Sequence, residues 1–291
     1  MKESTVLSHG ATHFTAVDST TMFADCGNRT LAYRVVGRGE PIILCHRFRA
    51  NLDDWDPAFL DALAQNFTVI TFDHSGFASS TGEHNMDALG YAKDVKDLAA
   101  ALGLEKIIVG GWSLGGFVAQ LVATEFPGLA THVILIGTRP PGKVEYGLEQ
   151  IFLDTAYKPS YTVEDETILF FEPTSAISRK AAHESHLRIA ARTSGNDTRI
   201  GEEKWVSYSR CAEDFDNDPY NARQKITETN LPILVVSADH EVCFPPENWF
   251  ALNRKLPTTQ IIIIPQAGHG PQHQYPGMIA SYITTFIFST K

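Results

Sequence analysis

A serine in a glycine-rich turn is the first candidate for chemistry in this chain. Residues 111–116 read Gly-Trp-Ser-Leu-Gly-Gly and closely follow the apolar run at residues 106–109. The pattern Gly-x-Ser-x-Gly after a strand is typical of a nucleophile elbow, a sharp turn from strand into helix that exposes the serine oxygen. Glycine is needed at positions 111 and 115, because backbone segments approach so closely there that larger side chains would collide. Ser113 is therefore the predicted nucleophile.

A serine hydroxyl needs a base within hydrogen-bond reach at neutral pH, and the imidazole of histidine is best suited to that task. The chain has eleven histidines, and His269 is the predicted base. It follows Gly268 in a short loop between an apolar run and the final helical segment. His273 is the alternative base, but four residues further on it would lie in or beside that last helix.

The imidazole in turn needs a carboxylate that fixes its tautomer and stabilises its cation. Two acidic residues, Asp239 and Glu241, follow the apolar run at residues 233–236. Spacing favours Glu241, which lies four residues before Pro245 and three after Ala238. Asp239 is the alternative acid. The chain order serine, acid, histidine differs from the orders of chymotrypsin and subtilisin.

Short apolar runs that alternate with amphipathic segments must position these groups. Helical spacing of apolar residues between the runs, as at Val95, Leu98, Ala99 and Leu102, predicts helices packed by one face. Regular alternation of strand and helix predicts a mostly parallel central sheet with helices on both faces, an α/β class whose sites lie at the carboxyl ends of strands. The strands expected in the first half lie at residues 29–36, 41–45, 67–72, 106–109 and 133–136.

The alternation stops at residues 139–142 and resumes near Leu231. The intervening residues 139–230 are richer in charge and in helix-forming sequence. Because strands of one sheet flank this segment, we predict a helical cap inserted into an α/β core made of residues 1–138 and 231–291. Aromatic residues of the cap are expected to pack more often than to contact substrate; they include Phe170, Phe171, Trp205 and Tyr208.

Three further elements are predicted after the cap. Residues 245–256 are expected to form a helix and residues 260–264 a strand. A C-terminal helix follows, and its apolar spacing predicts an inner face made of Ile279, Tyr282, Ile283 and Phe286.

Composition limits the classes of protein and partner. The chain has 291 residues, of which 43% are hydrophobic, so it can bury a substantial core. A net charge of −10 and the lack of a basic block argue against nucleic acid or an anionic membrane as a partner. The four cysteines show no paired spacing, so we expect neither a metal nor a cofactor. The polar residues 1–14 lack the apolar core of a secretory signal, and a cytoplasmic protein is expected.

From about residue 29 to residue 288 the chain resembles the α/β-hydrolase superfamily, in its capped, esterase and haloperoxidase-like branch. Such patterns are specific for fold and triad but poor at naming a substrate. The resemblance implies that the backbone amides of Leu114 and Phe48 form the oxyanion hole. It is carried by GWSLGG at 111–116, by PQAGHGPQHQYP at 265–276, and by Asp73, Gly76 and Ser80 in one loop.

The chain departs from this family at the end of the third strand. Relatives usually have His followed by Gly there, whereas His46 is followed by Arg47. Arg47, or Arg49 two residues further on, is a candidate to bind a substrate carboxylate; the alternative is that both arginines face solvent. Trp112, beside the nucleophile, is a second candidate substrate contact.

Together these residues predict a serine hydrolase that cleaves a small-molecule carboxylic ester or lactone through an acyl-enzyme intermediate. Haloalkane dehalogenases and epoxide hydrolases share the fold but need Asp in place of Ser113. Two alternatives stay open. One is a slow-turnover ligand-binding protein or receptor that keeps the triad, which Arg47 motivates. The other is a cofactor-free lyase or perhydrolase that uses the same site.

Overall fold

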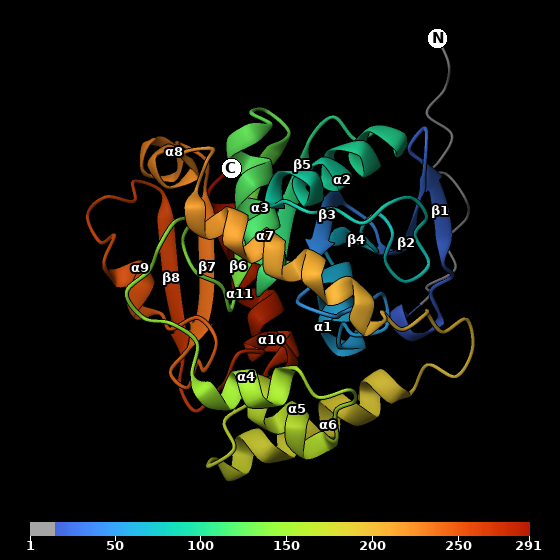
Figure 1. Cartoon of the computed structure of the whole chain (residues 1–291), viewed down its shortest axis with the longest axis vertical. Coiled ribbons are helices and arrows are strands. Elements are labelled where there is room, and N and C mark those ends of the chain that lie inside the picture. The colour runs from blue at the N-terminus through green and yellow to red at the C-terminus, as the bar shows by residue number, and fades with distance from the viewer. Residues whose placement is uncertain (1–14) are drawn as a thin grey trace.

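One central sheet organises the molecule, for which a computed structural model describes residues 15–291. Its strands lie in the order β1-β2-β4-β3-β5-β6-β7-β8. The pairs β1–β2 and β2–β4 are antiparallel, and the remaining pairs are parallel (Figure 1). The predicted α/β class with a mostly parallel sheet is confirmed. The prediction about residues 1–14 lies outside the described residues.

Several inner strands are buried along their whole length, which explains why their sequences are apolar runs rather than alternating patterns. Every residue of β4, β5 and β7 is buried. The predicted strands at residues 29–36 and 41–45 exist as β2 and β3, but β4 lies between them in the sheet. The strands are β1 (Met22–Asp25), β2 (Thr30–Gly37), β3 (Glu40–Cys45), β4 (Phe67–Phe72), β5 (Ile107–Trp112), β6 (Ala130–Ile136), β7 (Ile233–Ala238) and β8 (Thr259–Ile264).

Helices cover both faces of the sheet and enclose two hydrophobic cores. The helices α1 (Pro57–Ala64) and α11 (Pro276–Ser289) pack together on one face, and α2 (Ala88–Ala101) and α3 (Leu114–Glu125) on the other (Figure 1). Asp56 starts α1, because its side chain accepts a hydrogen bond from Ala58 N and Pro57 occupies the first helical position.

Two predictions near the C-terminus need correction. The helix expected at residues 245–256 is only the short α9 (Glu247–Phe250), followed by turns. Tyr282 is 40% exposed and does not belong to the inner face of α11. Ile279, Ile283 and Phe286 are buried and already form a stripe at i, i+4 and i+7, so Tyr282 falls at the edge of that stripe.

The segment between β6 and β7 folds into two groups of helices. In Figure 1, α4, α5 and α6 lie together beside α10 (Pro271–Gln274), at the end of the molecule where the site is found. The helices α7 and α8 instead pack against α2 and α3 and extend the helical layer of the core. The helices of the segment are α4 (Gln150–Ala156), α5 (Val163–Phe170), α6 (Ala176–Ala190), α7 (Trp205–Asn217) and α8 (Ala222–Glu228). Across residues 15–291, no helix has the length and apolar character that a bilayer crossing requires.

Candidate active site

Ser113 lies at the turn between β5 and α3 with φ 59° and ψ −123°, a conformation that is strained for a residue with a side chain. Its N–H donates to Ile136 O at 2.9 Å, which fixes the turn against β6. Glycine is required on both sides of it. A Cβ on Gly115 would lie 2.1 Å from Cys45 O, and one on Gly111 would lie 2.0 Å from Gly115 O. The structure therefore contains the strand-to-helix turn expected from the glycine spacing.

His269 and Glu241 form a buried hydrogen-bonded pair. His269 Nδ1 lies 2.7 Å from Glu241 Oε1, and the two side chains are 1% and 0% exposed. The same Oε1 accepts hydrogen bonds from Cys243 N at 2.9 Å and Phe244 N at 3.1 Å. Because this oxygen is an acceptor, we assign Nδ1 as the donor and Nε2 as the basic atom. Nε2 is buried and has no hydrogen-bond partner within residues 15–291.

The alternative acid and the alternative base lie elsewhere. Asp239 is exposed, and its Oδ1 accepts a hydrogen bond from Ala267 N at 3.3 Å. His273 is buried, and its Nε2 accepts a hydrogen bond from Asp56 N at 3.2 Å. Burial lowers the pKa of His273 to about 4. The structure thus places Glu241, and not Asp239, on the imidazole, and it gives His273 a structural partner.

A pocket between the elbow at Ser113 and the helices α4 and α5 brings Ser113 and His269 together. Its empty space, including the open mouth, is about 230 Å³. The helices α4 and α5 supply much of its wall. Sequence reasoning missed most of these cap residues, because an insertion has no sheet register that fixes which of its aromatic residues face the site. The pocket is lined by Arg47, Phe48, Ser113, Phe152, Ala156, Tyr161, Leu169, Phe170 and His269.

The two amides expected to form an oxyanion hole flank this pocket. Phe48 lines it, and Leu114 is the first residue of α3. Neither N–H donates a hydrogen bond within the described part of the chain. The loop that holds Phe48 runs close to the elbow, since a Cβ on Gly115 would lie 2.6 Å from His46 O. Both amides therefore lack an acceptor among residues 15–291.

Comparison with known proteins identifies the family. The profile of the alpha/beta hydrolase fold matches residues 40–276. The protein belongs to the α/β-hydrolase fold family. The resemblance drawn from the sequence, including its haloperoxidase-like branch, is confirmed.

Individual relatives of this α/β-hydrolase agree with that assignment. A putative non-heme chloroperoxidase from Synechocystis sp. is 24% identical over 273 residues, which cover 88% of this chain and 94% of that protein. The pimeloyl-[acyl-carrier protein] methyl ester esterase of Pseudoalteromonas atlantica is 38% identical over 114 residues, 38% of this chain and 42% of that protein. The solved structure of an alpha/beta hydrolase fold protein from Chitinophaga pinensis matches with a TM-score of 0.83 and 24% identity, over 94% of this chain and 99% of that one.

Arg47 of this α/β-hydrolase is 8% exposed, so the alternative of a solvent-facing side chain is wrong. Its guanidinium lies over the ring of Phe170, 4.5 Å from the centroid, and 5.2 Å from that of Trp112. Nη1 donates to Phe48 O at 2.8 Å, and Nη2 donates to Asp54 Oδ1 at 3.0 Å. A positive charge is therefore held in the wall of the pocket that Ser113 lines.

Arg49 is also directed inward, toward the cap. Its Nη1 donates to Ala156 O at 2.8 Å and to Lys158 O at 2.7 Å, and its Nη2 donates to Pro159 O at 3.0 Å. Its guanidinium lies 4.0 Å from the centroid of the Trp205 ring. Arg49 thus joins the loop of Phe48 to the segment after α4, and its terminal nitrogens donate to three backbone carbonyls and to the Tyr161 hydroxyl.

Trp112 contacts the loop that carries His269. The indole is buried, and its Nε1–H donates to His269 O at 2.7 Å. Trp112 is not among the residues that line the pocket. We therefore assign it a contact with the histidine loop rather than with a substrate.

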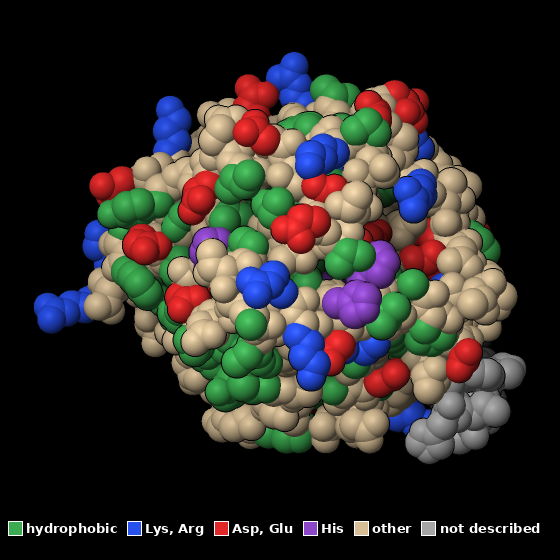
Figure 2. All heavy atoms as spheres, turned by 90° about the horizontal axis from the view of Figure 1, so that it is seen from below, with side chains coloured by type: hydrophobic (Ala, Val, Ile, Leu, Met, Phe, Trp, Pro, Cys, Tyr) green, Lys and Arg blue, Asp and Glu red, His purple; other side chains and the backbone are tan. Residues whose placement is uncertain are grey.

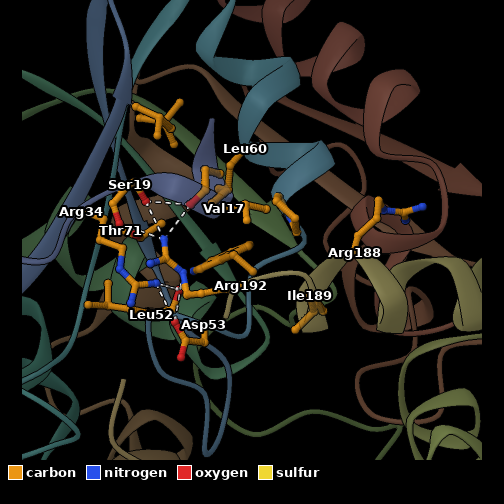
Figure 3. Close-up of a pocket in the computed structure, with 15 residues that line it drawn as sticks. Val17, Ser19, Arg34, Leu52, Asp53, Leu60, Thr71, Arg188, Ile189 and Arg192 are labelled. Atoms are coloured by element: carbon orange, nitrogen blue, oxygen red, sulfur yellow. Dashed lines mark hydrogen bonds and ion pairs between the residues drawn. The ribbon is translucent and has the colours of Figure 1, made fainter. Parts of the chain in front are cut away.

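A second cavity lies away from Ser113, between the segment before β1, the loop before α1 and the end of α6 (Figure 3). The guanidinium groups of Arg34 and Arg192 point toward Asp53 and Ser19 there. Arg34 Nη1 donates to Asp53 at 2.7 Å, and Arg192 Nη2 donates to Ser19 O at 2.9 Å. These donors serve the fold, so we assign this cavity no chemistry. Within residues 15–291, no group of three or more His, Cys, Asp or Glu side chains could hold a metal ion.

The surface seen from the side of α4, α5 and α6 carries charges of both signs. In Figure 2, Lys and Arg side chains are interspersed with Asp and Glu, and hydrophobic side chains lie between them. This face therefore has mixed character, without one extended patch of a single charge.

Proposed function

We propose that this protein is a serine hydrolase that cleaves a carboxylic ester or a lactone through an acyl-enzyme on Ser113. The observation that carries the proposal is one pocket lined by both Ser113 and His269, with Glu241 bound to the far nitrogen of the imidazole. Nucleophile, base and orienting acid have the roles that acyl transfer requires. The local similarity to a methyl ester esterase supports an ester as the substrate.

In the acylation half-reaction, Ser113 Oγ attacks the carbonyl carbon while His269 Nε2 takes the hydroxyl proton. The carbonyl oxygen becomes an oxyanion, which the free N–H groups of Leu114 and Phe48 stabilise. Glu241 stabilises the imidazolium, because its Oε1 already accepts the Nδ1 proton. Collapse of the tetrahedral intermediate breaks the ester C–O bond, and His269 gives its proton to the departing alkoxide.

In the deacylation half-reaction, water takes the place of the alcohol. His269 Nε2 removes a proton from the water as its oxygen attacks the acyl carbon. The same two amides stabilise the second oxyanion. Breakage of the bond to Ser113 Oγ releases the carboxylic acid, and the serine recovers its proton from His269.

Ser113→Ala tests this function. Turnover of p-nitrophenyl butyrate should fall by about 10⁴-fold or more, with a thermal midpoint close to that of the wild type. A fluorophosphonate should label the wild type stoichiometrically and leave Ser113→Ala unlabelled. Undiminished turnover in the variant would refute the proposal. Labelling of the wild type without measurable turnover would support the slow ligand-binding alternative instead.

Perhydrolysis is a second candidate, favoured by the similarity to a putative non-heme chloroperoxidase over most of both chains. Hydrogen peroxide would then attack the acyl-enzyme in place of water, so that a peracid leaves and Ser113 is regenerated. Bromide oxidation in acetate buffer with hydrogen peroxide measures the peracid. If the protein is a perhydrolase, the wild type should oxidise bromide faster than Ser113→Ala. Equal rates of bromide oxidation in the two proteins would exclude this function.

A further inference from the structure

The pocket of Ser113 contains one permanently charged side chain, Arg47. Apart from His269 and the nucleophile, the other lining residues are apolar or aromatic: Phe48, Phe152, Ala156, Tyr161, Leu169 and Phe170. We propose that the Arg47 guanidinium binds a carboxylate of the substrate, so that the preferred substrates are short esters that carry a second, anionic group. This inference rests on the proposed ester hydrolysis and names its substrate class.

The hydrogen-bonding capacity of Arg47 is only partly used. A guanidinium has five N–H donors, and the described structure gives partners to Nη1 and Nη2, namely Phe48 O and Asp54 Oδ1. Nε is buried and has no hydrogen-bond partner among residues 15–291. A buried donor on a charged group is costly to leave unpaired, whereas a carboxylate accepts from the planar fork in two bonds. The site therefore lacks an acceptor that such a substrate would supply.

The charge of Arg47 is also incompletely balanced. Asp54 is its carboxylate partner, but that side chain is 34% exposed and its other oxygen accepts a hydrogen bond from Asn51 N at 2.8 Å. Solvent therefore screens Asp54 more than it screens Arg47. The rings of Phe170 and Trp112, both buried, lie 4.5 and 5.2 Å from the guanidinium, and such apolar surroundings strengthen its attraction for an anion.

Three other arginines, Arg34, Arg49 and Arg188, differ from Arg47 in the acceptors that their guanidinium groups bind. Arg49 is used by cap carbonyls, and Arg34 by Asp53 and backbone oxygens. Arg188 pairs with Asp56 Oδ2 at 2.6 Å, and Asp56 is fully buried. Arg47 alone among these four lines the pocket of the nucleophile. Its position beside the reacting serine, rather than its charge alone, is what points to a substrate contact.

The test compares kcat/KM for two esters of similar size, monomethyl glutarate and methyl hexanoate, by methanol release at pH 7.5. The free carboxyl of the half-ester is ionised at this pH. The wild type should prefer the half-ester by at least about tenfold. In Arg47→Met, kcat/KM for the half-ester should fall by about 30-fold more than kcat/KM for the neutral ester, and the additional loss should appear mostly in KM.

Two further variants separate substrate binding from a structural role. Asp54→Asn removes the competing negative charge, so it should raise the preference for the half-ester several-fold, which the loss of a merely structural contact would not do. Arg38→Met is the control. It removes the same charge from the exposed turn before the amino end of β3, and kcat/KM for both esters should stay unchanged. If Arg47→Met does not fold, Arg47→Lys keeps the charge without the fork and should give an intermediate preference.

A binding measurement keeps this inference separate from the proposed function. Calorimetry can measure the binding of glutarate to Ser113→Ala, which requires no turnover. Binding should be lost in the double variant Ser113→Ala/Arg47→Met. If the protein binds glutarate but hydrolyses no ester, the anion site is supported and the proposed hydrolase function is refuted. Hydrolysis of both esters with equal kcat/KM, and equal loss in Arg47→Met, would overturn the anion site and leave the hydrolase standing.

Discussion

The indole of Trp112 holds the backbone of His269 through a buried hydrogen bond of 2.7 Å. Trp112 is the last residue of β5, so the strand that leads to Ser113 also fixes the loop that carries His269. A direct contact between their own elements therefore constrains the relative position of these two side chains.

Trp112→Phe should lower kcat by about tenfold, because the histidine loop loses this anchor. It should also lower the free energy of unfolding by about 1 to 3 kcal/mol, since a buried carbonyl loses its donor. The matched control is Trp249→Phe, which removes a similar buried bond to Thr138 O, 2.7 Å long, without touching the pocket. Both variants should lose stability in urea titrations, and only Trp112→Phe should lose kcat. A similar kcat in both variants would contradict the anchoring role.

Replacement of the two acids distinguishes their roles. Glu241→Gln should lower kcat for an active ester by about 10³ to 10⁴-fold, because the imidazole loses the carboxylate that fixes its tautomer and stabilises its cation. Asp239→Asn should change kcat by less than about threefold, since Asp239 is exposed and bound to Ala267 N. Steady-state kinetics of both variants, prepared together, check this. A more severe loss in Asp239→Asn would reverse the assignment.

His273 should make the protein less stable as the pH falls. Burial lowers its pKa to about 4 in the folded protein, against about 6.5 in the unfolded chain. Between these values the unfolded chain binds more protons, so the free energy of unfolding decreases as the pH drops from about 6.5 to about 4, by up to about 3 kcal/mol. Urea titrations at several pH values should show a shallower pH dependence for His273→Gln, which keeps an acceptor for Asp56 N. Identical pH dependences would exclude this residue as a source.

Close packing of the histidine loop against the cap makes Gly268 sensitive to substitution. A Cβ there would lie 2.3 Å from Phe171 O, a backbone atom that can move only with the cap. Gly268→Ala should lower the free energy of unfolding by about 1 to 3 kcal/mol and reduce kcat/KM more than tenfold. Gly277→Ala, in α11 with no atom within 4 Å of the added carbon, should leave kcat/KM unchanged and stabilise the protein by up to about 1 kcal/mol. Equal behaviour of the two variants would argue against the close contact.

The elbow could be predicted from the sequence because its geometry is local. The close approach at Gly111 and Gly115 requires glycine within a five-residue pattern, and the apolar run before it supplies the strand. Glu241 and His269 could be predicted from the sequence for a related reason. Each follows an apolar run, and parallel strands bring their carboxyl ends to one edge of the sheet.

Features that depend on long-range packing could not be predicted from the sequence in this way. Spacing along the chain could not show that β4 would lie between β2 and β3, because strand order depends on pairing between distant segments. The cap poses the same problem. Phe152 and Tyr161 line the pocket while Trp205 packs in the core, and all three occur in similar helical or loop sequence. The direction of Arg47 was likewise left open, since it depends on Phe170 and Asp54.

Arg49 ties the loop of Phe48 to the end of α4 and the residues that follow it. Phe48 precedes Arg49 in the chain, and Arg49 itself donates to the carbonyls of Ala156, Lys158 and Pro159. A displacement of residues 156–159 must therefore either break these bonds or move the loop of Phe48 with it. The position of this segment is thus mechanically coupled to a loop that lines the pocket of Ser113.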